Sequence, residues 1–169
     1  GWHTLALRSD GIVSAWGRNT DGQCNVPALP TGMSYVQISA GGYHSTALRS
    51  DGALIAWGQN HDGQTNVPAL PSGLVYDGIA TGMLHTLARR SDGEVIAWGR
   101  NTFGQTNVPP TPTGVTNVEV AAGQFHSIAL RSDGSLVAWG SNSDGQTNVP
   151  ALPTGLTYTQ IDAGAAHTV

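Results

Sequence analysis

A single spacing of 41 residues organises almost the whole chain. It separates five histidines, which are His3, His44, His85, His126 and His167. The same spacing separates four tryptophans, which are Trp16, Trp57, Trp98 and Trp139. Such self-similarity predicts a repeat protein, in which each unit buries its apolar faces against its neighbours.

Most of the sequence falls into register on this period. "RSDG" begins at 8, 49, 90 and 131, "AWG" at 15, 56, 97 and 138, and "GQ" at 22, 63, 104 and 145. We therefore expect one domain over 1–169. Its units are approximately 1–41, 42–82, 83–123 and 124–164, and 165–169 begins a fifth.

Each unit has the composition of a small β-sheet. "HSIALR" and "SLVAWG" flank Asp133 and Gly134, and Asp-Gly between such runs predicts a tight hairpin with positive φ at both turn residues. A third strand is predicted over 156–164 and in the equivalent segments of other copies, and a short outer strand near "TNV". Strands without clean alternation indicate sheets covered on both faces, as in the blades of a propeller.

The boundary between the second and third units is the least regular part. Asp77 and Gly78 interrupt the predicted inner strand, and Arg89 replaces the leucine found in the other copies. We expect Arg89 to reach Glu94 diagonally across the hairpin, or to mark a contact surface.

The stretch "AGQFHSIALRSDGSLVAWGSNSDGQ", residues 122–146, resembles the repeat of the regulator of chromosome condensation family. The resemblance extends over all four copies and implies an all-β propeller. It also implies a larger ring than four blades, because the family's founder has seven. "GWHTL" and "AAHTV" fill the same slot at the two ends of the chain, which favours a segment of a larger propeller. Two chains completing an eight-bladed ring is the alternative, followed by four blades closing alone.

The founder exchanges nucleotide on the small GTPase Ran and docks on nucleosomes, and both activities are alternatives for this chain. Every unit has the same length, which leaves no room for the inserted wedge that the resemblance associates with exchange. The family's photoreceptor uses Gly-Trp-Arg-His-Thr segments, whereas this chain has one tryptophan and no arginine before these histidines. The absence of lysine and a net charge of −4 disfavour direct contact with nucleic acid.

The repeated polar residues are best interpreted as structural. We expect the periodic tryptophans to form the core between blades and the periodic histidines to bind loop backbone, although a metal ring or a pH sensor is the alternative. The "NxDGQxN" loop resembles part of a calcium loop, but it has one carboxylate per copy and Phe103 replaces it in the third. A single cysteine, Cys24, excludes an internal disulfide. We predict no metal, no cofactor and, because no unique catalytic constellation stands out, no enzyme.

Positions that vary among the copies are the candidate binding residues. The residue before the periodic histidine and the residues after "WG" differ from copy to copy. The candidates are Trp2, Tyr43, Phe125, Arg18, His61 and Arg100. On one face of a propeller they form a surface for a protein, peptide or glycan, whereas on opposite faces the surface splits into two. Ordinary surface drift is the other interpretation.

These observations predict a non-catalytic scaffold that binds a protein or a glycan, with a lectin as an alternative. The resemblance to bacterial members of the family leads us to expect a bacterial, extracellular protein, and the absence of a long apolar run predicts no contact with membrane. We expect further blades or a second chain to complete the propeller ring.

Overall fold

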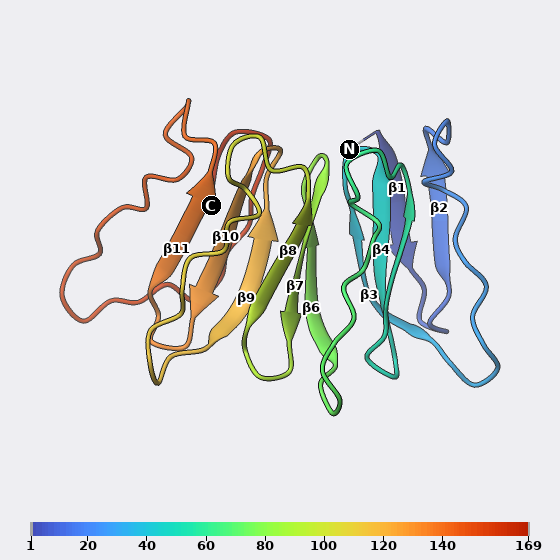
Figure 1. Ribbon diagram of the computed structural model, residues 1–169, viewed down its shortest axis with the longest axis horizontal. Helices are drawn as coiled ribbons and strands as arrows, with labels where there is room; N and C mark the ends of the chain where they lie inside the picture. The colour runs from blue at the N-terminus through green and yellow to red at the C-terminus, as the bar shows by residue number, and fades with distance from the viewer. Residues whose placement is uncertain (1, 169) are drawn as a thin grey trace.

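The computed structural model describes residues 2–168, which form an array of four antiparallel sheets (Figure 1). The first sheet pairs β1 (His3–Leu7) with β2 (Val13–Gly17). The other three sheets have three strands each. They are β3 (Tyr35–Ala40), β4 (His44–Arg49) and β5 (Leu54–Gly58); β6 (Tyr76–Thr81), β7 (His85–Arg90) and β8 (Val95–Gly99); β9 (Asn117–Ala122), β10 (His126–Arg131) and β11 (Leu136–Gly140).

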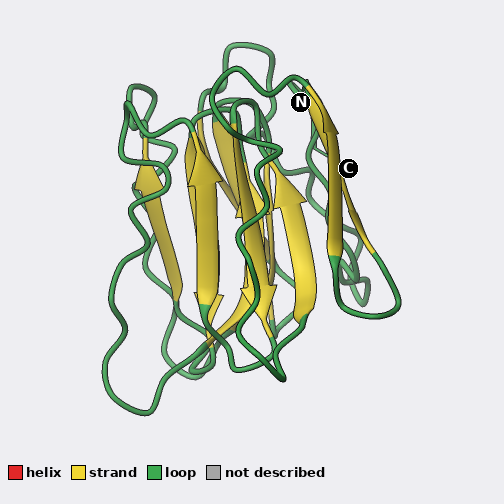
Figure 2. Ribbon diagram, turned by 90° about the vertical axis from the view of Figure 1, so that its right-hand side faces the viewer, coloured by secondary structure: helices red, strands yellow, loops and turns green. Residues whose placement is uncertain are grey.

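The sheets succeed one another in chain order, as the blades of a partial propeller do. Figure 2 shows the strands running between two layers of loops, with only strand and loop in the described part of the chain. The fold class predicted from the period is therefore confirmed.

The hairpin turns differ from the prediction in one detail. In the fourth blade the amide of Gly134 donates to the carbonyl of Arg131 over 2.9 Å, and the amide of Arg131 donates to the carbonyl of Ser135 over 2.9 Å. Gly134 has a φ of 77°, whereas no other residue type in 2–168 has a positive φ. The prediction of positive φ at both Asp133 and Gly134 was wrong, because the loop is longer than two residues and only its glycine enters the left-handed region.

The Asp77-Gly78 pair does not interrupt its strand. β6 runs through both residues and pairs with β7, with a register shift between Tyr76 and Gly78. The first and third of the three-stranded sheets have a shift at the corresponding place. The irregularity is therefore a bulge shared by the blades and is not caused by Gly78.

The short outer strand predicted near "TNV" is absent from residues 2–168. In the second copy, Asn66 donates its amide to the carbonyl of Gly63, and Val67 donates to that of Thr65, so the segment is a series of turns. Val67 and Leu70 still pack against the core from this loop. Residues 156–164 also form no strand and have one isolated bridge, Ala163 to Thr168.

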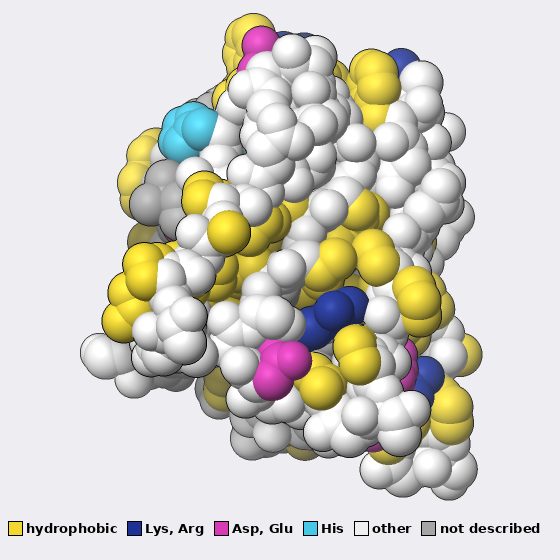
Figure 3. All heavy atoms as spheres, turned by 90° about the vertical axis from the view of Figure 1, so that its left-hand side faces the viewer, with side chains coloured by type: hydrophobic (Ala, Val, Ile, Leu, Met, Phe, Trp, Pro, Cys, Tyr) yellow, Lys and Arg dark blue, Asp and Glu magenta, His cyan; other side chains and the backbone are white. Residues whose placement is uncertain are grey.

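The core lies between neighbouring sheets. One cluster joins Val13 of the first sheet to Tyr35, Ala47 and Trp57 of the second, and another joins Leu48 of the second to Ile79 of the third. Sheets covered on both faces explain why the strands lack clean alternation of apolar and polar residues. Figure 3 shows the end of the array near the C-terminus, where hydrophobic side chains gather in the middle of the surface.

Candidate binding surface

The two kinds of variable position lie on the same face of the array. Each residue after "WG" donates its amide to the carbonyl of the residue before the periodic histidine: Arg18 to Trp2, Gln59 to Tyr43, Arg100 to Leu84 and Ser141 to Phe125, over 2.9–3.0 Å. The strands β2, β5, β8 and β11 end here, at the upper edge of Figure 1. We call this face, with Trp2, Arg18, Tyr43, His61, Arg100, Phe103 and Phe125, the loop rim. Its candidates form one surface and do not split between two faces.

An aromatic pair and an arginine form the first part of the loop rim. The rings of Trp2 and Tyr43 stack with centroids 6.4 Å apart. The guanidinium carbon of Arg18 lies 5.4 Å from the Trp2 ring centroid and 5.1 Å from that of Tyr43. These distances are within the range of cation–π attraction. Trp2 is 61% exposed, so the cluster is open to solvent.

A second aromatic pair lies further along the loop rim. The rings of Phe103 and Phe125 have centroids 5.3 Å apart, and Phe103 is 50% exposed. Arg100, from the same loop as Phe103, donates its Nε to Thr102 Oγ1 over 3.0 Å. The sequence showed Phe103 only as a replacement for aspartate, and its pairing with Phe125 depends on the contact between neighbouring blades. His61 is exposed in the loop between these two parts.

The loops of the four copies share one shape, which comes from the same internal hydrogen bonds in each copy. In the second copy, Asn60 donates its Nδ2 to Asn66 Oδ1 over 2.8 Å and accepts the Thr65 amide, while Gln64 Oε1 accepts the Asp62 amide. All four copies repeat these bonds. Within 2–168, no group of three or more histidine, cysteine or acidic side chains is arranged to hold a metal. The loops present variable side chains from a fixed frame.

The periodic histidines connect neighbouring blades. His3, His44 and His85 each place Nε2 2.8–3.0 Å from a hydroxyl of the next blade, which belongs to Ser45, Thr86 and Ser127 respectively. We expected contacts to loop backbone, but the main-chain contact is made through this hydroxyl. It donates to the carbonyl of Gln23, Gln64 or Gln105, which also accepts the indole N–H of Trp57, Trp98 or Trp139.

The direction of these bonds fixes the state of the histidines. A hydroxyl that donates its one hydrogen to a carbonyl accepts from Nε2, so each imidazole carries its proton on Nε2. Burial lowers the pKa of His44 to about 3 and that of His85 to about 4, so both are neutral near pH 7. Burial also lowers the pKa of His3 and of His126, which contacts Thr168 Oγ1 at 3.3 Å. His167 is exposed.

The tryptophans differ in environment. Trp57 and Trp139 are buried and Trp98 is partly buried, whereas Trp16 is 54% exposed. Trp16 lies on the first sheet, and no described sheet precedes it. The expectation that all four form core between blades therefore fails at Trp16.

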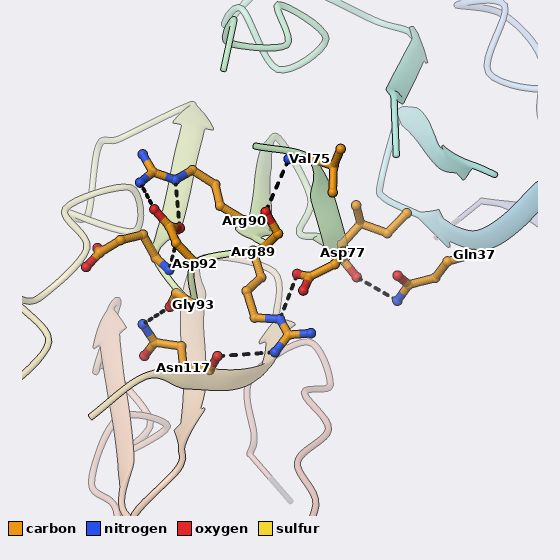
Figure 4. Close-up of polar contacts among 11 residues, drawn as sticks. Gln37, Val75, Asp77, Arg89, Arg90, Asp92, Gly93 and Asn117 are labelled. Atoms are coloured by element: carbon orange, nitrogen blue, oxygen red, sulfur yellow. Dashed lines mark hydrogen bonds and ion pairs between the residues drawn. The ribbon is translucent and has the colours of Figure 1, made fainter. Parts of the chain in front are cut away.

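Arg89 forms a contact that the sequence did not predict. Its Nε lies 3.0 Å from Asp77 Oδ1, and its Nη1 donates to the carbonyl of Asn117 in the next blade over 3.3 Å (Figure 4). The expected partner, Glu94, was wrong, because Asp77 lies beside Arg89 on the adjacent strand β6. The contact does not require a glycine at 78, since an added Cβ would lie 3.4 Å from Arg89 Cβ, an ordinary van der Waals distance.

A hollow of about 530 Å³ lies along the inner strands β3, β6 and β9. Trp2 of the loop rim lines it, together with the Gly41-Gly42 and Gly82-Met83 turns. The hollow and the loop rim therefore share Trp2.

The sequence matches the regulator of chromosome condensation (RCC1) repeat over residues 1–23, 35–64, 77–105 and 118–146. These segments contain the four hairpins and the contacts of His3, His44 and His85 with the hydroxyls of the next blade. The chain belongs to the RCC1 repeat family. No curated protein sequence matches this RCC1-repeat chain.

Solved structures agree with this assignment. Prp20p from Saccharomyces cerevisiae, studied for its binding to Gsp1p and histones, is 27% identical with a TM-score of 0.79, over 97% of this chain and 51% of that one. The ectodomain of the Physcomitrella patens receptor kinase CR4 matches with 23% identity and a TM-score of 0.74, over 98% and 46%. Human WBSCR16 matches with 20% identity and a TM-score of 0.79, over 98% and 54%. The last two show the fold alone, and the RCC1-repeat chain spans about half the length of the structures it matches.

Proposed function

We propose that the chain is a non-catalytic scaffold that binds a protein partner through the loop rim. The observation that carries this proposal is the Arg18 guanidinium held against the rings of Trp2 and Tyr43 on an open surface. Arginine and aromatic side chains are the types that most often dominate binding energy at protein interfaces. The rigid loops beneath them reduce the ordering cost of binding.

The hydrogen-bond directions support a non-catalytic role. A serine nucleophile needs a histidine that accepts the hydroxyl proton. Here the Ser45 and Thr86 hydroxyls donate to main-chain carbonyls, and each accepts from the histidine of the preceding blade. The periodic histidine and hydroxyl pairs are therefore arranged for stability and not for acyl transfer.

The comparison favours a protein as the partner class. Prp20p was studied for its binding to Gsp1p and histones, and yeast RCC1 (Prp20) was also solved bound to Kap60. Each of these partners is a protein. A glycan ligand is the main competing outcome, because exposed aromatic rings also stack on sugars.

We also infer that further blades, of the same chain or of a second chain, complete the ring. The exposed Trp16 supports this inference, because its equivalents Trp57 and Trp139 are covered by a neighbouring sheet. A measured solution mass of 17.5 kDa for this chain, with Trp16 still open to fluorescence quenchers, would contradict pairing of two chains.

The binding surface is tested by selecting ligands and mapping where they bind. Random peptides on phage and an array of glycans are offered to the purified chain, and amide hydrogen exchange is compared with and without the best binder. We expect a peptide to be selected and to protect 18–23, 41–43 and 100–105. Protection of the hairpin turns at 8–11 and 49–52 instead, selection of glycans alone, or selection of nothing would contradict the proposal.

A further inference from the structure

The seven arginines of the chain divide into three groups by partner. Four form ion pairs: Arg8 with Asp10, Arg49 with Asp51, Arg89 with Asp77 and Arg90 with Asp92. A fifth, Arg131, donates its Nη2 to the carbonyl of Pro110 over 2.9 Å. Within residues 2–168, Arg18 and Arg100 have no acidic partner, and both lie on the loop rim.

Arg18 and Arg100 are held in the same way. Arg18 donates Nε to Thr20 Oγ1 over 2.9 Å, and Arg100 donates Nε to Thr102 Oγ1 over 3.0 Å. Each bond uses Nε and leaves the two Nη groups without a hydrogen-bond partner among the described residues. A fixed guanidinium with free Nη groups is suited to bind a carboxylate through two parallel N–H donors.

The surroundings of the two arginines favour a ligand that is both acidic and apolar. Arg18 is flanked by Trp2 and Tyr43, while the loop of Arg100 carries Phe103 against Phe125. Near Arg18, the carboxylate of Asp21 accepts from Thr20 Oγ1 over 2.9 Å and from Gln59 Nε2 over 3.4 Å. The third copy has Phe103 in place of this aspartate, so the loop of Arg100 has no carboxylate of its own.

We propose that the loop rim binds an acidic segment of a partner protein, with one carboxylate on Arg18 and another on Arg100. The two arginines occupy equivalent positions two blades apart, so the segment crosses the intervening loop that carries His61. Apolar side chains of the segment pack on Trp2 and on the pair of Phe103 and Phe125. This inference rests on the proposed function and specifies its partner.

The experiment measures which peptides the chain selects and how strongly the two arginines contribute. Peptides selected from a random library are sequenced, and the affinity of the best is measured by fluorescence anisotropy. The variants are Arg18→Gln, Arg100→Gln and both together, and Arg8→Gln and Arg49→Gln are matched controls from the opposite face. Arg18→Lys retains the charge but loses the paired donors.

We expect the selected peptides to be enriched in aspartate and glutamate. Affinity should fall about tenfold for each single glutamine variant and about a hundredfold for both, because one charge-assisted pair contributes about 1.4 kcal/mol or more. The controls should leave affinity unchanged, Arg18→Lys should give an intermediate loss, and added salt should weaken binding.

Three results would overturn the proposal. They are selected peptides without acidic enrichment, an unchanged affinity in the double variant, and binding of a uronate-rich polysaccharide in place of peptides. Neutral peptides that still protect the loop rim from hydrogen exchange would overturn this inference and leave the proposed function standing. Peptides that bind elsewhere would overturn both.

Discussion

His44 and Thr86 belong to adjacent blades, and the Nε2 of His44 donates to the Oγ1 of Thr86 across 2.9 Å. The hydroxyl of Thr86 in turn donates to the carbonyl of Gln64, which also accepts the indole N–H of Trp98. The same relay occurs at each described boundary between blades. It joins consecutive sheets by polar contacts inside an otherwise apolar interface, which gives the array a fixed register.

Removing one hydroxyl from this relay should destabilise the chain. Thr86→Val leaves the buried Nε2–H of His44 without its acceptor and should lower the free energy of unfolding by about 2 kcal/mol. Thr86→Ser is the control, since serine occupies the equivalent positions 45 and 127, and should cost under about 1 kcal/mol. Urea denaturation measures both, and equal losses in the two variants would count against the relay.

Acid should destabilise the folded chain, because its buried histidines resist protonation. The pKa of His44, about 3, and that of His85, about 4, are lowered from the ordinary value near 6.5 by burial. The unfolded chain therefore takes up protons before the folded chain does, so stability is complete above pH 6.5 and decreases as pH falls toward 4. Each histidine contributes a slope of about 1 kcal/mol per pH unit in that window.

Urea midpoints at several pH values between 7 and 4 test this prediction. The control is His61→Gln, which removes an exposed histidine outside the contacts between blades. His85→Gln should flatten the slope. A stability that is constant between pH 7 and pH 5 would show that the folded chain protonates these rings as readily as the unfolded chain does.

Gly82, which begins the turn before His85, should tolerate no side chain. A Cβ on Gly82 would lie 2.1 Å from His85 Cε1 and 2.6 Å from the carbonyl of Gly123. Gly82→Ala should therefore cost about 3 kcal/mol or more, through displacement of the imidazole and the neighbouring backbone. Gly78→Ala, in the same strand region, meets only ordinary contacts at 3.4 Å and should cost under about 1 kcal/mol. A similar loss in both variants would contradict the packing account.

Arg89 should be replaceable by the leucine of the other copies. Its pair with Asp77 is partly exposed, since the two side chains are 23% and 37% accessible, and such pairs contribute about 0–1 kcal/mol. Arg89→Leu should change the free energy of unfolding by less than about 1 kcal/mol, whereas Leu87→Ala, fully buried in the same strand, should cost about 2–5 kcal/mol. Thermal denaturation distinguishes the two, and a large loss for Arg89→Leu would assign it a larger structural role.

The sequence alone predicted the parts of this fold that local chemistry determines. The 41-residue period and the Asp-Gly turns located the hairpins, and the family resemblance identified the propeller. The outer strand near "TNV" was wrong, because the clamp between Asn60 and Asn66 holds that segment in turns. The error at Arg89 had a different origin, since pairing with Asp77 depends on the register of β6 against β7.

The candidate surface was only partly visible in the sequence. Variation among copies identified Trp2, Arg18 and Tyr43, but their mutual contact depends on the hydrogen bonds that bring the two loop types together. The pairing of the histidines with Ser45 and Thr86 was missed, although these hydroxyl residues follow the periodic histidines in every copy and could have been found by the same period.

The most direct test of the loop rim is the ¹⁵N NMR spectrum of the arginine Nε groups during titration with a selected acidic peptide. The chain has only seven arginines and no lysine, so single Arg→Gln variants assign every signal. We predict that the Arg18 and Arg100 signals shift together and saturate at one peptide per chain, while those of Arg8 and Arg49 remain unchanged. Shifts confined to Arg8, Arg49 or Arg90, or no shift at saturating binding, would contradict the account.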